Sequence, residues 1–181
     1  MRKLFLLILC LVALNVCAQE KNKIEWLEFE TAVAKAKENP KKIFVDLYTD
    51  WCTWCKVMDN TTFSDSTIID YMNRTFYCVK FNAESSDTIH FSGHDFVNPN
   101  PNTKRSTHQL AAAMLQGRMS YPSFVFFNEN QVIITAVPGY HKPEQFEVIL
   151  NYIGSDAIMN TKMEDFVKEF RPEILENDTQ K

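Results

Sequence analysis

Apolar residues between positions 26 and 153 alternate between helical spacing and short unbroken runs, which is typical of an α/β fold. Trp26, Phe29, Val33 and Ala36 recur at helical spacing, and Asn39-Pro40 ends that helix before the next apolar run. The same patterns continue along the chain, with predicted strands at 43–48, 76–82, 123–127 and 131–137 and predicted helices at 26–36, 52–60, 66–73, 107–115 and 143–153. This order, βαβ followed by αββα, predicts a central mixed sheet flanked by helices.

Turn and capping residues mark boundaries in the second half of the chain. Asn128-Glu129-Asn130 separates two apolar runs and predicts a β-hairpin turn, and Pro138-Gly139 ends the second run. Pro143 suits the first turn of the helix that follows. Thr161 and Glu164 predict a capping box at the start of one further amphipathic helix, which extends the fold at its C-terminal end.

Residues 83–106 form a polar insert without sustained helical periodicity. A stretch of this length inside a compact domain is usually either functional or mobile. Its apolar residues, Ile89, Phe91, Phe96 and Val97, indicate a small hairpin rather than a fully disordered segment.

The first 18 residues have the features of a targeting segment. Two basic residues precede an apolar run, 4–16, that is shorter than the roughly 20 residues needed to cross a bilayer as a helix. Val16-Cys17-Ala18 has the small-residue character of a signal-peptidase site. We therefore expect a signal peptide at 1–18 that is cleaved near Ala18, and a single domain at 19–181. The expected product is periplasmic or secreted, without stable membrane insertion.

Lipidation at Cys17 and a retained membrane anchor are the alternatives to this cleavage. Val16 is larger than the Gly, Ala or Ser expected before a lipidated cysteine, so we favour cleavage.

Charge and cysteine content narrow the range of partners. Loss of Arg2 and Lys3 with the leader would leave 17 basic and 23 acidic residues, and an acidic chain without a basic patch argues against nucleic acid or anionic lipid as a partner. Three cysteines would remain, Cys52, Cys55 and Cys78, which is not the disulfide framework of a small secreted fold. Cys78 lies in a predicted strand, where we expect a buried structural thiol rather than a resolving one.

Cys52 and Cys55 form a C-x-x-C motif directly after the predicted strand 43–48. If a helix begins at Cys52, both sulfurs lie on its first turn, within disulfide reach. The unpaired N–H groups and the dipole at a helix N-terminus favour a thiolate there, and a thiolate is the species that attacks disulfides. Trp51 and Trp54 suit a surface on which peptide segments dock. The motif predicts dithiol–disulfide exchange, with the cysteine pair as the redox-active group and no separate cofactor.

Metal binding is the alternative from another class of function. Half of a zinc site has the same spacing, and a metallochaperone would hold Cu(I) or Zn(II) through Cys52, Cys55 and a histidine. The chain has no second C-x-x-C, and the spacing of His90, His94 and His108 matches no zinc pattern. We therefore expect no metal site.

Asp46 lies in the middle of a predicted strand, six residues before Cys52. Burying a carboxylate is costly unless it has a partner or a task, and burial raises its pKa. Asp46 is thus a candidate acceptor for the proton of Cys55 when a mixed disulfide resolves. The alternative is that Asp46 caps a neighbouring turn or faces solvent. Lys80, on the neighbouring predicted strand, is its candidate charge partner.

Two features of the second half add to this site. Tyr121-Pro122 opens the predicted strand 123–127, and a cis proline there would leave the preceding backbone free to hydrogen-bond an extended peptide. Gly139 follows the last strand, where close approach of backbones is common.

These residues resemble the thioredoxin superfamily. The segment Val45–Lys56, taken with Thr62–Asp65, is most similar to the C-terminal periplasmic domain of DsbD-type thiol reductases and to small secreted thioredoxin-like proteins. Tyr121–Phe124 resembles the family's cis-proline segment, and Gly139 its late glycine. The resemblance covers most of residues 24–153 and leaves the insert and the C-terminal helix outside it.

The resemblance implies a thioredoxin-like fold and reversible dithiol–disulfide exchange. The roles that it implies are attack by Cys52, resolution by Cys55, proton acceptance by Asp46 and substrate contact by Pro122. Beside them, Trp51, Trp54 and Tyr121 are candidate substrate contacts, and Lys56, Lys80 and Gly139 are candidate supporting residues. Thr53-Trp54 stands where ordinary thioredoxins have Gly-Pro, and that dipeptide helps to set the redox potential.

We therefore expect an exported oxidoreductase that acts on cysteine-containing client proteins in the reducing direction. Its reductant would be a separate membrane or soluble electron donor. A disulfide isomerase or oxidase is the alternative within the enzyme class. We expect the 83–106 insert to shape the substrate groove near Pro122.

Overall fold

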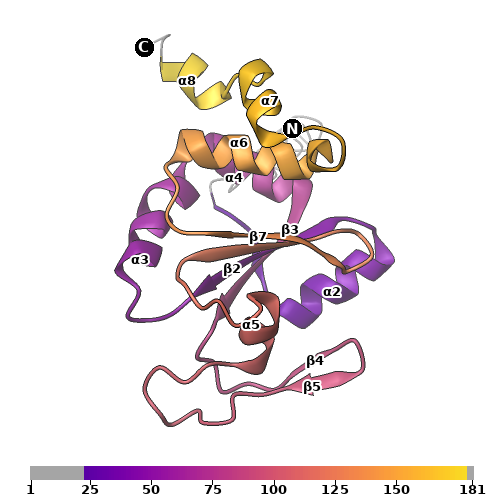
Figure 1. The fold of residues 1–181 in the computed structure, drawn as a ribbon, viewed down its shortest axis with the longest axis vertical. Coiled ribbons are helices and arrows are strands. Elements are labelled where there is room, and N and C mark those ends of the chain that lie inside the picture. The colour runs from indigo at the N-terminus through magenta and orange to yellow at the C-terminus, as the bar shows by residue number, and fades with distance from the viewer. Residues whose placement is uncertain (1–22, 179–181) are drawn as a thin grey trace, which may run out of the picture.

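A five-stranded mixed sheet forms the centre of the protein in a computed structural model that describes residues 23–178 (Figure 1). Its strands are β1 (Trp26–Leu27), β2 (Lys42–Tyr48), β3 (Phe76–Asn82), β6 (Ser123–Phe127) and β7 (Ile133–Pro138). The spatial order is β1-β3-β2-β6-β7, so β2 is central and β1 and β7 are the edges. The first three strands run parallel, whereas β6 and β7 are antiparallel to their neighbours. The predicted mixed sheet is therefore confirmed.

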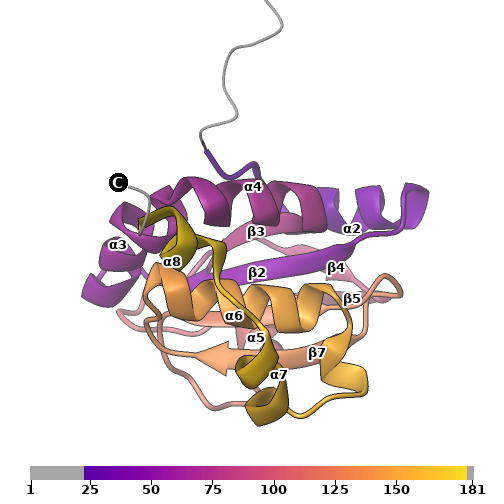
Figure 2. The same ribbon diagram turned by 90° about the horizontal axis from the view of Figure 1, so that it is seen from above.

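Helices cover both faces of this sheet. The helices and 3₁₀ turns of the described residues are α2 (Phe29–Glu38), α3 (Thr53–Asn60), η1 (Thr62–Ser64), α4 (Ser66–Thr75), α5 (Gln109–Met114), α6 (Pro143–Gly154), η2 (Ala157–Met159), α7 (Met163–Glu169) and α8 (Glu173–Asp178). Figure 1 shows α4 and α6 on one side of the sheet and α2 and α5 on the other. Seen from above, α3 lies beyond one end of the strands, next to α4 (Figure 2).

Strand β2 is buried on both faces because its side chains alternate between two hydrophobic cores. Val45 and Leu47 belong to the core that includes α2 and α5. Phe44 belongs to the core that includes α4 and α6, and its ring centroid lies 5.7 Å from that of Phe124. Asp46 shares a face of the strand with Phe44, so the alternation that buries the phenylalanine also takes the carboxylate out of water.

The insert contains the expected hairpin, formed by β4 (Ile89–Phe91) and β5 (His94–Phe96). Ser92 and Gly93, the two residues between the strands, have φ angles of 51° and 76°. Positive φ at both turn residues is characteristic of a tight type I′ hairpin, which matches the twist of the strands. Phe91 anchors the hairpin, because its ring centroid lies 5.1 Å from that of Phe29 in α2.

The prediction that Trp26 belongs to a helix with Phe29 is wrong. Trp26 lies in the two-residue strand β1, paired with Cys78 in β3, and the helix begins only at Phe29. A strand of two residues has no periodicity of its own, and Trp26 lies three residues before Phe29, so its spacing matched that of the helix that follows.

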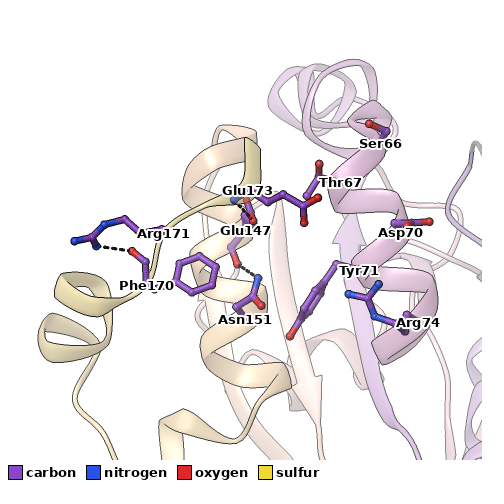
Figure 3. A pocket seen from close by; sticks show the side chains of 10 residues that line it. All are labelled: Ser66, Thr67, Asp70, Tyr71, Arg74, Glu147, Asn151, Phe170, Arg171 and Glu173. Carbon is purple, nitrogen blue, oxygen red and sulfur yellow. Dashed lines mark hydrogen bonds between the residues drawn. The ribbon is translucent and has the colours of Figure 1, made fainter. Parts of the chain in front are cut away.

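The predicted C-terminal helix is present as α7, but its capping box at Thr161 and Glu164 is wrong, and a second helix, α8, follows it. Lys162 is the N-cap of α7 and makes no side-chain capping bond. The Thr161 backbone is already used, because its N–H donates to the Ala157 carbonyl at 2.8 Å and its carbonyl accepts from the Tyr152 hydroxyl at 2.5 Å. Proline at position 172 then cannot continue a helix, so α7 and α8 form as two short helices, and the segment that joins them carries Phe170 and Arg171 (Figure 3).

The expected signal peptide lies outside the described residues. Within residues 23–178, none of the helices is both long enough and apolar enough to cross a membrane.

Candidate active site

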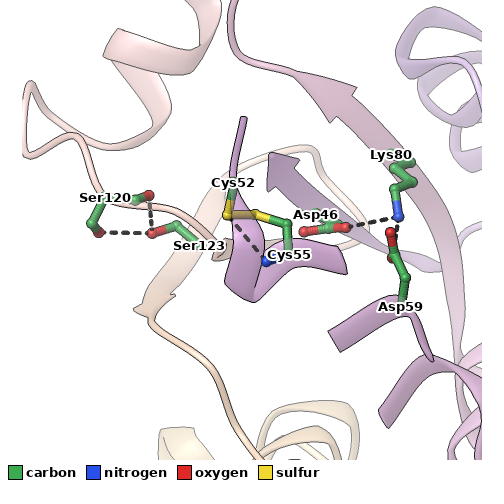
Figure 4. Close-up of a disulfide and its surroundings, with 7 residues drawn as sticks. All are labelled: Asp46, Cys52, Cys55, Asp59, Lys80, Ser120 and Ser123. Carbon is green, nitrogen blue, oxygen red and sulfur yellow. Dashed lines mark hydrogen bonds and ion pairs between the residues drawn. A yellow bond between two sulfur atoms is a disulfide. The ribbon is translucent and has the colours of Figure 1, made fainter. Parts of the chain in front are cut away.

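Cys52 and Cys55 are joined by a disulfide at the N-terminus of α3, as the motif predicted (Figure 4). Cys52 is the N-cap residue, and its sulfur accepts a hydrogen bond from the Cys55 N–H at 3.1 Å. The turn that leads into the helix is held by Thr49, whose carbonyl accepts from the Cys52 N–H at 3.0 Å. In the reduced protein, the same helix N-terminus would stabilise a thiolate on Cys52.

Asp46 is buried behind the disulfide, with 1% of its surface exposed. Figure 4 shows its carboxylate between Cys55 and Lys80. Burial raises the pKa of Asp46 to about 7, and the opposing charge of Lys80, whose Nζ lies 3.6 Å from Oδ2, limits that rise. Among the described residues, Oδ1 has no hydrogen-bond partner. A carboxyl group in this state can exchange a proton near neutral pH.

Lys80 also forms an ion pair with Asp59, a residue that sequence reasoning missed. Asp59 lies four positions after Cys55, on the same face of α3, so the helical repeat was a signal that could have identified it. The carboxylate of Asp59 adds to the rise of the Asp46 pKa. Asp59 and Lys80 also line a cavity of about 440 Å³, so this carboxylate–lysine–carboxylate row extends from the buried Asp46 to an open surface.

The Tyr121-Pro122 peptide bond is cis, as expected if this loop receives an extended peptide. The Pro122 carbonyl accepts from the Gly139 N–H at 2.8 Å, and the buried Ser123 hydroxyl donates to the Ser120 carbonyl at 2.8 Å. Figure 4 places Ser120 and Ser123 on the side of the disulfide opposite Asp46.

Close approach of another backbone does not explain Gly139, contrary to the prediction. Its φ is +91°, a backbone conformation that residues with a side chain rarely adopt, whereas a Cβ built there would meet nothing within 4 Å. The glycine is required by the turn and not by close approach of another backbone.

Trp51 and Trp54 flank the disulfide, with 50% and 57% of their surfaces exposed. Each packs against a tyrosine from the second half of the chain. The ring centroids of Trp51 and Tyr121 lie 5.9 Å apart, and those of Trp54 and Tyr140 lie 5.2 Å apart. Exposed aromatic side chains held by neighbours are suited to contact a polypeptide. Tyr140 was not identified from the sequence, because its contact with Trp54 is long-range.

Lys56 is exposed on α3, and the structure links it to the site through its backbone N–H, which donates to the Cys52 carbonyl at 3.4 Å. Cys78 lies apart from the pair in the core with α4, and burial raises the pKa of its thiol to about 12. This is the environment of an unreactive structural cysteine.

The four histidines are dispersed. His108 is buried and caps α5 by accepting from the Leu110 N–H at 3.1 Å. His90 pairs with Asp95, and His141 contacts the Pro138 carbonyl. Within residues 23–178, no group of three or more His, Cys, Asp or Glu side chains is arranged to hold a metal ion.

Comparison with known proteins places this geometry in a family. The family model described as "Thioredox_DsbH: Protein of unknown function, DUF255" matches residues 14–178. The chain belongs to this DsbH-like family.

Two curated relatives match shorter parts of the chain. Thiol:disulfide interchange protein DsbD of Pseudoalteromonas atlantica is 38% identical over 50 residues, which is 28% of this chain and 8% of that protein. Uncharacterized protein B0495.5 of Caenorhabditis elegans is 33% identical over 69 residues, which is 38% of this chain and 10% of that protein. The matched segments therefore span a small fraction of both relatives.

Solved structures show the same fold. A DsbH oxidoreductase superposes with a TM-score of 0.53 at 15% identity, covering 74% of this chain and 85% of the other. A thioredoxin-fold protein from Helicobacter pylori gives 0.55 at 22% identity, covering 72% and 80%. A putative disulphide-isomerase from Bacteroides thetaiotaomicron gives 0.52 at 24% identity, covering 77% and 98%. The thioredoxin-like fold expected of this DsbH-like chain is therefore confirmed.

Proposed function

We propose that this DsbH-like protein is an exported thiol–disulfide oxidoreductase that reduces disulfides in cysteine-containing client proteins of the periplasm or cell exterior. The observation that carries the proposal is the position of Cys52. It caps a helix, is bonded to Cys55, and lies between a cis-proline loop and a buried carboxyl group.

The proposed reaction begins with the reduced dithiol. The Cys52 thiolate attacks one sulfur of a client disulfide, the client S–S bond breaks, and the other client sulfur leaves as a thiolate. The product is a mixed disulfide between Cys52 and the client.

Resolution requires a second thiolate, on Cys55. Asp46 takes the Cys55 proton through its carboxylate, and the Cys55 sulfur then attacks Cys52 Sγ. The bond to the client breaks, the client leaves fully reduced, and two electrons have moved from the protein dithiol to the client. A separate dithiol donor, in the membrane or in solution, would return the protein to its reduced state.

Cysteine variants test the proposal. Cys52→Ser is expected to abolish reduction of insulin disulfides, because the attacking sulfur is lost. Cys55→Ser is expected to accumulate mixed disulfides that are visible on non-reducing gels. Cys78→Ser is the matched control and should reduce insulin at the parent rate, because Cys78 is buried away from the pair. Unaltered insulin reduction by the Cys52 and Cys55 variants would refute the proposal.

The direction of exchange is tested by the equilibrium potential of the Cys52–Cys55 couple against glutathione. A potential of about −270 mV, as in thioredoxin, would support a reductase, and a potential of about −120 mV would indicate an oxidant. Stoichiometric metal in the reduced protein, without disulfide exchange, would instead favour a metal-binding module.

A further inference from the structure

The insert closes on Trp51, the residue that precedes the attacking cysteine. The Trp51 indole N–H donates to the Glu84 carboxylate at 2.9 Å, at the beginning of the insert. The Arg105 guanidinium carbon lies 5.1 Å from the centre of the Trp51 ring, at the end of the insert. Tyr121 packs edge-on against the same ring. Contacts from both ends of the insert and from the cis-proline loop thus hold the exposed Trp51 side chain in place.

Arg105 is an unusual residue within this arrangement. Its φ is +61°, in the left-handed region that residues with a side chain rarely adopt, and such positions cluster at sites where the surrounding structure imposes them. Its side chain is exposed, and within residues 23–178 it forms no salt bridge. A guanidinium that rests on an indole face keeps its N–H donors available at its edges.

We propose that Arg105, presented on Trp51, selects client segments that carry a carboxylate next to the cysteine attacked by Cys52. The inference rests on the proposed exchange function and names its substrate class. A client sulfur must reach Cys52, which follows Trp51 directly in the chain. The client residues beside that sulfur therefore pass within reach of Arg105, which lies on the Trp51 ring. A carboxylate accepts two parallel hydrogen bonds from a guanidinium, which fixes both position and orientation.

Glu84 opposes the effect of Arg105 on an acidic client side chain. Its carboxylate lies at the edge of the Trp51 ring and Arg105 lies over the face, so the two charges act on an approaching acidic side chain with opposite sign. Removing one charge should therefore increase, and removing the other decrease, the same preference.

Three disulfide-bonded peptides, identical except for Glu, Gln or Lys next to the attacked cysteine, provide the test. Single-turnover reduction by the dithiol form of the full protein is measured at low ionic strength. The parent is expected to reduce the Glu peptide about three- to fivefold faster than the Gln peptide, and the Lys peptide most slowly, as for an exposed charge pair at low ionic strength. The ratio should approach one at about 1 M salt.

Variants of the insert assign the preference to its residues. Arg105→Gln is expected to bring the Glu-to-Gln rate ratio to about one, and Arg105→Lys to retain part of it, because the charge stays but the planar fork is lost. Glu84→Gln should raise the ratio above that of the parent, since an amide oxygen can still accept from the indole N–H. Lys104→Gln, one residue away, is the matched control and should keep the parent ratio.

The outcomes separate this inference from the function on which it rests. Equal rates for the three peptides, or a ratio that Lys104→Gln and Arg105→Gln reduce alike, would overturn the role of Arg105 while leaving exchange in place. Failure of the parent to reduce any of the three, the uncharged Gln peptide included, would overturn the proposed function itself.

Discussion

Strand β2 carries two buried charged side chains, Lys42 at its first position and Asp46 four residues later, and their surroundings differ. Lys42 donates to Glu129 at 2.8 Å and to Asp156 at 3.0 Å. Asp46 has its nearest cation at 3.6 Å, and among the described residues one of its oxygens has no partner. The strand thus holds a fully paired charge at its first residue and an incompletely paired one nearer its middle.

The two pKa values follow from this difference. Burial lowers the pKa of Lys42, but hydrogen bonds to two carboxylates outweigh burial and raise it, so Lys42 stays charged at every ordinary pH. Burial raises the pKa of Asp46 to about 7, and Lys80 offsets only part of the rise. Lys42, which is fully paired, therefore carries a fixed charge that links three segments of the chain. Asp46, which is incompletely paired, can gain and lose a proton near neutral pH.

The largest expected effect comes from Asp46→Asn, which removes the titrating group and keeps its shape. Between about pH 4 and pH 7 the folded protein holds the Asp46 proton while the unfolded chain has lost it, so the parent loses stability as pH rises through this range. We expect the variant to exceed the parent in free energy of unfolding by on the order of 2–4 kcal/mol at pH 8, and to equal it near pH 4.

Urea unfolding of the oxidised proteins at several pH values measures this difference. The same variant should resolve mixed disulfides more slowly at neutral pH, because the proton of Cys55 loses its acceptor. A stability difference that stays constant from pH 4 to pH 8 would show that Asp46 does not titrate in this range.

Loss of the Lys42 charge should lower the free energy of unfolding by the same amount at every ordinary pH. Lys42→Met is expected to lower the free energy of unfolding by about 1–2 kcal/mol, because its two partners are 41% and 59% exposed and remain hydrated when the cation is lost. The loss should be the same at pH 5 and pH 8, since Lys42 is protonated at both. Insulin reduction at the parent rate would separate this structural ion pair from the active site, and a loss confined to alkaline pH would contradict the fixed charge.

The sequence identified Asp46 as a candidate functional residue, but it gave no sign that Lys42 is buried and paired. Asp46 interrupts a buried apolar run, and a polar residue in such a run signals a task or a partner. Lys42 stands at the end of the same run, where a lysine is ordinary, and its partners lie 87 and 114 residues away in the chain. No local pattern encodes contacts of that range.

The same distinction explains the rest of the site. The strand and the cysteine pair on the helix follow from local signals between residues 43 and 60, and so does Asp59 in retrospect. The cis form of Pro122 was expected from the fold and not from the Tyr-Pro dipeptide, because an X-Pro bond is trans by default. The contacts of Glu84 and Arg105 with Trp51 depend on how the insert folds back, which periodicity does not describe.

The smallest effects should come from the neighbours of Asp46 and should have opposite signs. Lys80→Met removes the nearby positive charge and leaves Asp59 facing Asp46, so the pKa of Asp46 should rise above its parent value of about 7. Asp59→Asn removes a negative charge and frees Lys80 for Asp46, so that pKa should fall. The pH dependence of mixed-disulfide resolution reports both displacements as shifts of its midpoint.

Opposite shifts distinguish a charge effect from a damaged fold, which would slow resolution without moving the midpoint in two directions. Asp165→Asn is the control, because it breaks the exposed Asp165–Lys168 ion pair on α7 and should leave the midpoint unchanged. A midpoint that moves the same way in both active-site variants would mean that Asp46 does not set it. The proton acceptor would then have to be sought elsewhere, and the contrast between Lys42 and Asp46 in β2 would be structural only.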